Sequence, residues 1–154
     1  MLEFFQVEDQ YIKFLQKFDK RIPIISYKTH DKFLCGTVLR IGNHHYYVPV
    51  SSVTKQMHTN FALYDAKGAL LSSLRFCFMF LATAQVLTRI SIKGIKQNDP
   101  QYAALLQEEW NYCRANEASI LTIAKRVFKM GCNANHPLHY ACCDFPMLER
   151  EYVN

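Results

Sequence analysis

The chain has 154 residues, enough for a domain with a hydrophobic core of its own. Half of the residues are hydrophobic and 14% are aromatic, which excludes an intrinsically disordered chain. Lysine and arginine outnumber aspartate and glutamate by 18 to 13, and the resulting charge of +5 favours an anionic partner without identifying it. We expect one domain over residues 1–154.

The first half of the chain carries the patterns of one helix and two hairpins. Tyr11, Leu15 and Phe18 repeat at helical spacing. The runs on either side of Gly42–Asn43, a turn pair, are rich in β-branched and aromatic residues. The predicted elements are a strand at 2–7, a helix at 9–18, a polar loop at 19–31, a hairpin of strands at 33–41 and 45–50, and a second hairpin of strands at 61–64 and 69–73.

The second half is predicted to be mainly helical. Asp99 and Asn116 suit N-cap positions, and Gly131 is typical of a helix end. The predicted elements are an apolar core segment at 76–87, a strand at 86–95, helices at 100–115 and 116–131, and a short helix at 144–152. Strands that come first, with hairpin connections, and helices that come last indicate an α+β domain on an antiparallel sheet.

The cysteines and the N-terminus bear on the compartment. Glu3, Glu8 and Asp9 interrupt the apolar start, which argues against a signal peptide. Cys35 and Cys77 lie in apolar runs, as buried free thiols do. The longest apolar stretch is far shorter than the roughly 20 residues of a membrane helix. We expect a cytoplasmic protein with reduced cysteines and no membrane contact.

Common catalytic and nucleotide-binding motifs are missing from the chain. It contains no P-loop, no dinucleotide fingerprint, no serine-hydrolase elbow and no zinc-protease motif. Its carboxylates form no spaced cluster of the kind that two-metal nucleases use, and Glu108–Glu109 is predicted to be a solvated pair on a helix. A nuclease with this sequence is therefore expected to work without a metal or another cofactor.

Two polar loops contain residue types that can cleave RNA without a metal. Such cleavage uses the 2′-hydroxyl of the RNA as nucleophile, so the protein must move protons and stabilise a crowded phosphorane. Lysine, histidine and hydroxyl side chains gather in residues 51–60 and 27–32. The two segments adjoin paired strands, so we expect them at the same edge of the sheet. Ordinary surface loops are the alternative interpretation.

Basic residues form two clusters beside aromatic or histidine residues. Cations can hold phosphates while rings stack on bases, so this combination favours an RNA-binding surface. Solvated helix faces are the alternative interpretation. The clusters are Lys13, Lys17, Lys20, Arg21, Lys28 and Lys32 in the first part of the chain, and Lys125, Arg126 and Lys129 later.

Cysteines and histidines near the C-terminus form a rival constellation. Soft ligands at short spacing are compatible with a structural zinc ion, but the segment lacks a C-x-x-C knuckle and contains Pro137. Buried thiols and loop histidines are the simpler interpretation. The residues are Cys132, His136, His139, Cys142 and Cys143.

Several short motifs follow one another in a fixed order along the chain. They are Tyr11-Ile12-Lys13 with Leu15 and Phe18-Asp19, Lys32 with Gly36, Tyr47 and Pro49 before Ser51-Ser52, Lys55 with His58, Arg114-Ala115-Asn116, and Cys143 with Phe145 and Leu148-Glu149. In these motifs and their order the chain resembles, over nearly its whole length, the ToxN/AbiQ family, the endoribonuclease toxins of type III toxin–antitoxin systems. Its compact size is most similar to the CptN branch.

The resemblance implies a fold and a function. The fold would be a twisted antiparallel sheet of the MazF/CcdB toxin type, partly barrel-like, with about four flanking helices. The function would be metal-independent, sequence-preferring cleavage of cellular and phage RNA in the bacterial cytoplasm, leaving 2′,3′-cyclic phosphate and 5′-hydroxyl ends. The partner would be a pseudoknotted antitoxin RNA, cut by the toxin from a repeat precursor and bound in a closed alternating assembly.

The polar loops, the basic clusters and the resemblance together give the candidate site residues. Lys55, Ser52, Ser51 and Lys32 would contact the scissile phosphate or the 2′-hydroxyl. The residues expected to bind RNA are Tyr27, Lys28, His30, His58, Asn60, Lys13, Lys17, Lys125, Arg126 and Lys129. A non-catalytic RNA-binding module is the alternative function. No helix-turn-helix or zinc-finger pattern supports a DNA-binding regulator.

Overall fold

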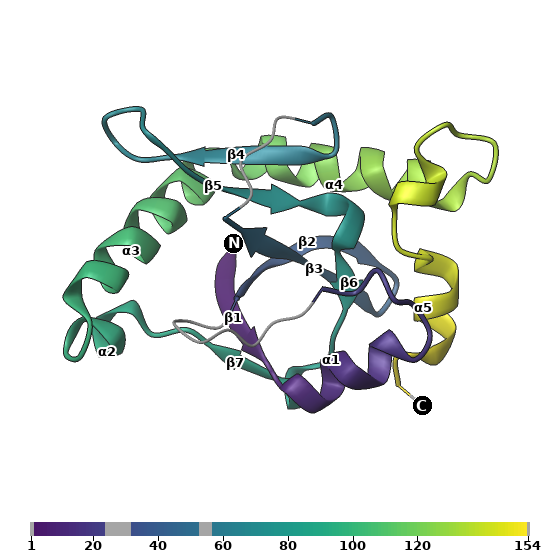
Figure 1. Ribbon diagram of the computed structural model, residues 1–154, viewed down its shortest axis with the longest axis horizontal. Coiled ribbons are helices and arrows are strands. Elements are labelled where there is room, and N and C mark those ends of the chain that lie inside the picture. The colour runs from purple at the N-terminus through teal and green to yellow at the C-terminus, as the bar shows by residue number, and fades with distance from the viewer. Residues whose placement is uncertain (1, 24–31, 53–56, 154) are drawn as a thin grey trace.

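The computed structural model describes residues 2–23, 32–52 and 57–153, and these form a sheet flanked by helices (Figure 1). The strands are β1 (Glu3–Val7), β2 (Leu34–Ile41), β3 (His44–Ser51), β4 (Asn60–Tyr64), β5 (Leu70–Arg75), β6 (Phe80–Leu81) and β7 (Leu87–Arg89). The α-helices are α1 (Asp9–Gln16), α2 (Ile92–Lys96), α3 (Pro100–Ala115), α4 (Glu117–Cys132) and α5 (Phe145–Glu151). Short 3₁₀ helices are η1 (Phe76–Phe78), η2 (Ala84–Val86) and η3 (His139–Ala141).

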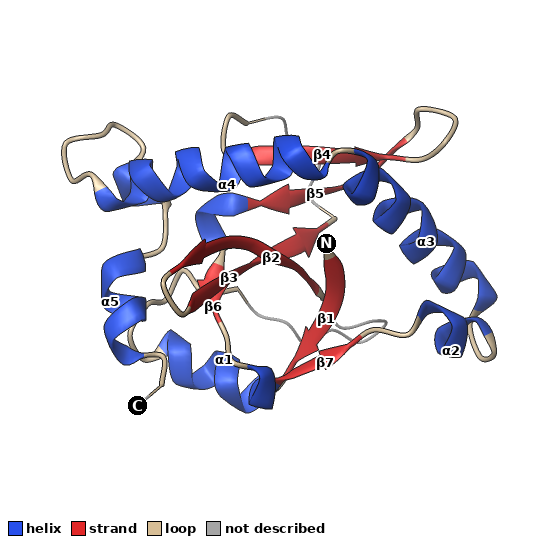
Figure 2. Ribbon diagram, turned by 180° about the vertical axis from the view of Figure 1, so that it is seen from behind, coloured by secondary structure: helices blue, strands red, loops and turns tan. Residues whose placement is uncertain are grey.

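The strands form one antiparallel sheet in the order β4-β5-β3-β2-β1-β7, and β6 pairs with β3. Over the described residues the sheet is open, with β4 and β7 at its two ends. Helix α3 packs against β4 and β5, and α4 packs against β2 and η1. In the view of Figure 2, α4 lies in front of the sheet. The α+β prediction is confirmed. Over the described residues there are five α-helices where the sequence predicted about four.

Both predicted hairpins are present. Strands β2 and β3 turn at Gly42, and β4 and β5 turn at Gly68. These two glycines have φ values of +57° and +84°, a conformation that glycine adopts without the steric cost other residues meet. Local turn chemistry therefore fixes the connections within these two hairpins.

The predicted strand at 86–95 is largely wrong. Only Leu87–Arg89 pairs with β1, and α2 begins three residues later. The side chain of Ser91 accepts a hydrogen bond from the Gly94 amide (3.1 Å), which caps this helix. The alternation of apolar and polar residues favoured a strand, but the cap and the packing of α2 beside α3 favour a helix.

One of the two predicted N-caps is confirmed, and Asp144 caps a further helix. Asp99 accepts from the Tyr102 amide (3.1 Å) at the start of α3, and Asp144 accepts from the Met147 amide (3.2 Å) at the start of α5. Asn116 does not cap α4, because its side-chain amide donates instead to the Tyr112 carbonyl (2.8 Å) at the end of α3.

The core lies between the sheet and the helices α4 and α5. Tyr46 on β3 contacts the rings of Phe128 and Phe145, with centroid separations of 5.5 and 5.8 Å. The first part of the apolar segment predicted as core, Phe76–Ala82, is buried except for the half-buried Phe78, and the six cysteines are all free. Among the described residues, no helix is long and apolar enough to cross a membrane.

Candidate functional site

A pocket of about 370 Å³ lies at the edge of the sheet where β3 and β5 end. Leu34 pairs with Pro49 in the β2–β3 register, so Lys32 lies opposite Ser51. Val50 pairs with Leu74 in the β3–β5 register, which brings Arg75 beside Pro49. The polar and aromatic residues that line the pocket are Gln16, Lys20, Arg21, Lys32, Ser51, Arg75 and Phe78.

The structure brings two predicted site residues together, as the hairpin pairing predicted. Lys32 and Ser51 both line the pocket, and Ser51 is only 3% exposed. Ser52, the next residue, is exposed at the end of β3. The predicted residues Lys55, Tyr27, Lys28 and His30 lie outside the described residues.

Arg75 is a pocket residue that the sequence analysis missed. Its guanidinium carbon lies 4.5 Å from the centroid of the Phe78 ring, and its buried Nε has no hydrogen-bond partner among the described residues. The signal in the sequence is an arginine between two strongly apolar neighbours, Leu74 and Phe76, which are both fully buried. Arg75 itself is half-buried and lines the pocket.

The pocket is positively charged. Its described walls contain four cations and no carboxylate. Arg21 is held in place: its Nε donates to Asp19 (2.9 Å) and its Nη1 to the Tyr140 carbonyl (3.1 Å). The hydrogen bond to Asp19 raises the pKa of Arg21. Cations with few nearby anions create a field that suits phosphate.

The positive charge of Arg75 contributes to a lowered pKa at a nearby thiol, Cys77. Hydrogen bonds from Cys142, with the two sulfur atoms 3.3 Å apart, and from Thr59 lower the pKa of Cys77 to about 7, and the positive charge of Arg75 acts in the same direction. Cys77 is buried in η1, next to the pocket residue Phe78 in the chain.

The remaining predicted RNA-binding residues lie outside this pocket. Lys13 forms an ion pair with Asp9 (3.1 Å), and Arg126 donates to the backbone carbonyl of His58. Asn60 is the register partner of Arg75 across the β4–β5 pair. Exposed side chains among the predicted set are Lys13, Lys17, His58, Lys125, Arg126 and Lys129.

Three of these cations define a second basic region, the α4 surface, made of Lys125, Arg126 and Lys129 on the exposed side of α4. Lys125 also lines an open pocket of about 460 Å³ between α4 and β2, together with Arg40. The chain therefore presents cations at two separate places, the pocket at the end of β3 and the α4 surface.

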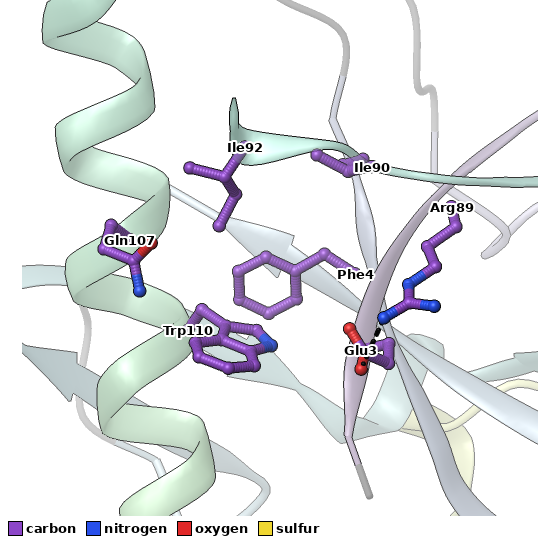
Figure 3. Close-up of a pocket in the computed structure, with 7 residues that line it drawn as sticks. All are labelled: Glu3, Phe4, Arg89, Ile90, Ile92, Gln107 and Trp110. Carbon is purple, nitrogen blue, oxygen red and sulfur yellow. Dashed lines mark hydrogen bonds and ion pairs between the residues drawn. The ribbon is translucent and has the colours of Figure 1, made fainter. Parts of the chain in front are cut away.

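Figure 3 shows a smaller pocket of about 160 Å³ on another part of the molecule. Its walls are largely apolar, with the rings of Phe4 and Trp110 facing its interior. Arg89 donates to Glu3 (3.0 Å), so the positive charge at its rim is neutralised. This pocket is less suited to a phosphate than the one that contains Lys32 and Ser51.

Glu109 corrects the prediction of a solvated carboxylate pair. It is only 2% exposed, and its Oε2 accepts a hydrogen bond from Ser72 (2.5 Å). Burial raises the pKa of this carboxyl to about 7. Helical spacing turns Glu109 toward β5 while its neighbour Glu108 faces outward and accepts from the Ala66 amide.

The C-terminal cysteines and histidines are used in packing and turns. Cys142 contacts Cys77, and His136 accepts a hydrogen bond from the Leu138 amide at Nδ1 (3.0 Å). Cys132 is exposed at the end of α4. Within the described ranges, no group of three or more histidine, cysteine, aspartate or glutamate side chains is arranged to hold a metal ion.

Comparison with known proteins gives consistent matches in sequence and fold. The chain is 23% identical over 158 residues to the endoribonuclease ToxN of Bacillus thuringiensis subsp. kurstaki, covering 97% of this chain and 81% of that protein.

Two solved structures share the fold over almost the whole chain. One is of a bacterial type III system in which a non-coding RNA pseudoknot inhibits the toxin (TM-score 0.91, 23% identity, 99% of this chain and 96% of that chain). The other is AbiQ, a lactococcal anti-phage endoribonuclease (TM-score 0.85, 21% identity, 99% and 96%).

The family model described as "Toxin ToxN, type III toxin-antitoxin system" matches residues 3–153. This match spans nearly all of the fold, including the strands that form the pocket at the end of β3. The chain therefore belongs to the ToxN toxin family of type III toxin–antitoxin systems.

Proposed function

We propose that the chain is an endoribonuclease toxin whose active site is the pocket at the end of β3. The observation that carries this proposal is the convergence of Lys32, Ser51 and Arg75 in a cationic pocket without a carboxylate among its described walls. Cations and hydroxyls bind phosphate, whereas the ligands that Mg²⁺ prefers are carboxylates. The activity of the ToxN and AbiQ relatives supports the same conclusion.

The proposed reaction is a metal-independent transesterification. The 2′-oxygen attacks the adjacent phosphorus and gives up its proton, the bond from phosphorus to the 5′-oxygen breaks, and that oxygen takes up a proton. The products are a 2′,3′-cyclic phosphate and a 5′-hydroxyl. Lys55 and Lys32 stabilise the negative charge on the phosphorane, while Ser52 and Ser51 hydrogen-bond the phosphate or the 2′-hydroxyl.

The proposed partner is a pseudoknotted antitoxin RNA that the toxin cuts from a repeat precursor. Inhibition of a structural relative by an RNA pseudoknot supports this partner. A closed alternating assembly requires two RNA contacts on each protein. The pocket receives an RNA end, and the α4 surface of Lys125, Arg126 and Lys129 contacts the neighbouring RNA. Cellular and phage RNAs in the bacterial cytoplasm are the other substrates.

Alanine at Lys55 or Ser52 tests the proposal. Removing one phosphate contact is expected to lower kcat by about 10²–10³-fold, since such groups act mainly on the transition state. Binding of the antitoxin RNA should change by less than about fivefold, because many other phosphate contacts remain. The measurements are cleavage of labelled RNA in vitro, growth after induction, and RNA affinity at fixed salt.

The matched control is Lys67→Ala, which removes an exposed lysine from the β4–β5 turn. It should cleave like the wild type. If Lys55→Ala and Ser52→Ala both remain toxic, the active site is placed wrongly. If the wild-type chain binds the antitoxin RNA and cuts no RNA, the non-catalytic binding module is the correct function.

A further inference from the structure

Arg75 has a fixed position in the pocket. It is the last residue of β5, and the β4–β5 register pairs it with Asn60. Its neighbours Leu74 and Phe76 are fully buried and anchor the backbone on both sides. A side chain that starts from such an anchored backbone can be aimed at a ligand without much loss of freedom on binding.

The guanidinium of Arg75 is oriented by the Phe78 ring. The distance from the guanidinium carbon to the ring centroid is 4.5 Å, which is within the range of a favourable cation–π contact. The stacking holds the guanidinium without using its N–H donors. The ring contact therefore leaves these donors available for an acceptor in the pocket.

One of these donors lacks an acceptor in the protein. The Nε of Arg75 is buried and has no hydrogen-bond partner among the described residues. A buried donor without a partner is unfavourable, and such groups are rare in folded proteins. Arg21, in the same pocket, differs because Asp19 and the Tyr140 carbonyl already bind its guanidinium.

We propose that Arg75 is a catalytic residue that binds the non-bridging oxygens of the scissile phosphate. This proposal rests on the proposed function. As the 2′-oxygen bonds to phosphorus and the bond to the 5′-oxygen breaks, negative charge grows on these oxygens, and the guanidinium stabilises it. Arginine keeps its proton at any pH at which the protein is folded, so Arg75 contributes charge and geometry and transfers no proton.

The guanidinium fork predicts a difference between arginine and lysine. A planar fork can donate two hydrogen bonds to two oxygens of one phosphate, whereas an ammonium acts as a point charge. Arg75→Lys keeps the charge and most of the stem and should still lose at least about tenfold in kcat, and Arg75→Ala should lose about 10²–10³-fold. Both should bind an RNA with a 2′-deoxy group at the cleavage site within about fivefold of the wild type, because the contact strengthens mainly in the transition state.

Arg114→Ala is the matched control. Arg114 on α3 also stacks on an aromatic ring, with its guanidinium carbon 4.8 Å from the centroid of Trp110, but it does not line the pocket. This variant should cleave at the wild-type rate. Thermal unfolding of every variant shows which ones are folded, and Arg75→Lys serves as the test if Arg75→Ala does not fold.

Phosphorothioate substrates give a readout that a purely structural role would not change. Sulfur in place of one non-bridging oxygen weakens a hydrogen bond from Arg75 to that position, so the wild type should cleave one diastereomer more slowly than the other. Loss of this preference in the Arg75 variants and its retention in Arg114→Ala are the expected results.

Cleavage by Arg75→Ala or Arg75→Lys within about twofold of the wild type would overturn the role of Arg75 and leave the proposed function standing. A wild-type chain that cuts no RNA would overturn both.

Discussion

Glu109 is a carboxylic acid enclosed between α3 and β5. Its Oε2 accepts from Ser72, and its Oε1 is without a hydrogen-bond partner among the described residues. Burial raises its pKa from 4.5 to about 7 because the charged form loses its hydration. The folded protein therefore holds a proton at Glu109 that the unfolded chain has already released near neutral pH.

The pH dependence of stability follows from this difference in proton binding. As pH rises from 4.5 toward 7, the unfolded chain ionises Glu109 while the folded chain does not, so the free energy of unfolding falls. The full difference is about 3 kcal/mol. Glu109→Gln lacks this titration, so its free energy of unfolding should not fall with the wild type's as pH rises. The difference, variant minus wild type, should therefore increase by about 3 kcal/mol between about pH 4 and pH 8.

Urea unfolding at a series of pH values measures this prediction. Glu108→Gln is the control, because it removes a carboxylate from the same helix and leaves the buried one in place. Parallel pH profiles for Glu109→Gln and the wild type would show that Glu109 is ionised normally in the folded protein.

The contact between α4 and α5 depends on a glycine. Gly131, expected to end its helix, lies inside the last turn of α4, and the Phe145 ring packs against it. A Cβ at this position would lie 2.4 Å from a ring carbon of Phe145 and 3.1 Å from the Cβ of Cys142. Close approach of the two helices, and not helix termination, is the reason for a glycine here.

Gly131→Ala should therefore destabilise the protein. Alanine favours a helix interior over glycine by up to about 1 kcal/mol, but overpacking against a buried ring costs about 1–3 kcal/mol. We expect a net loss of about 1–2 kcal/mol in the free energy of unfolding, measured by urea denaturation. The exposed α4 variant Ser119→Ala should stay within about 0.5 kcal/mol of the wild type. A more stable Gly131→Ala would mean that Phe145 moves aside freely.

Elements whose signals are local could be predicted from the sequence. The two hairpins have glycines with positive φ at their turns, and α3 has an aspartate cap. The segment at 86–95 was mispredicted because it is divided between two short elements. Its strand, β7, has only three residues at the edge of the sheet, and its helix, α2, is a short helix that packs against α3. Short elements depend on tertiary contacts that a local pattern does not contain.

The same distinction applies to the site. Lys32 and Ser51 were placed together because the hairpin between them fixes their register. Arg75 was missed because β5 joins β3 by a long-range pairing that the sequence does not reveal. Glu109 was misplaced because the helical pattern alone does not say that β5 covers this side of α3. The roles of Lys55 and Tyr27 come from the family resemblance and remain predictions.

For the whole molecule, two separated basic regions on one small fold are consistent with an RNA-binding toxin. The pocket at the end of β3 combines Lys32, Ser51 and Arg75, and the α4 surface adds three exposed cations that do not line this pocket. A net charge of +5 favours contacts with an anionic partner at both regions. We propose that this pocket cleaves RNA with the 2′-hydroxyl as nucleophile.

The most direct test is to incubate the purified, RNA-stripped chain with RNA in excess EDTA and to map the chemistry of the fragment ends. We predict cleavage that leaves 2′,3′-cyclic phosphate and 5′-hydroxyl ends. Cleavage that requires an added divalent ion and leaves 5′-phosphate ends would contradict the proposed mechanism, and folded protein that cuts no RNA under either condition would contradict the proposed activity.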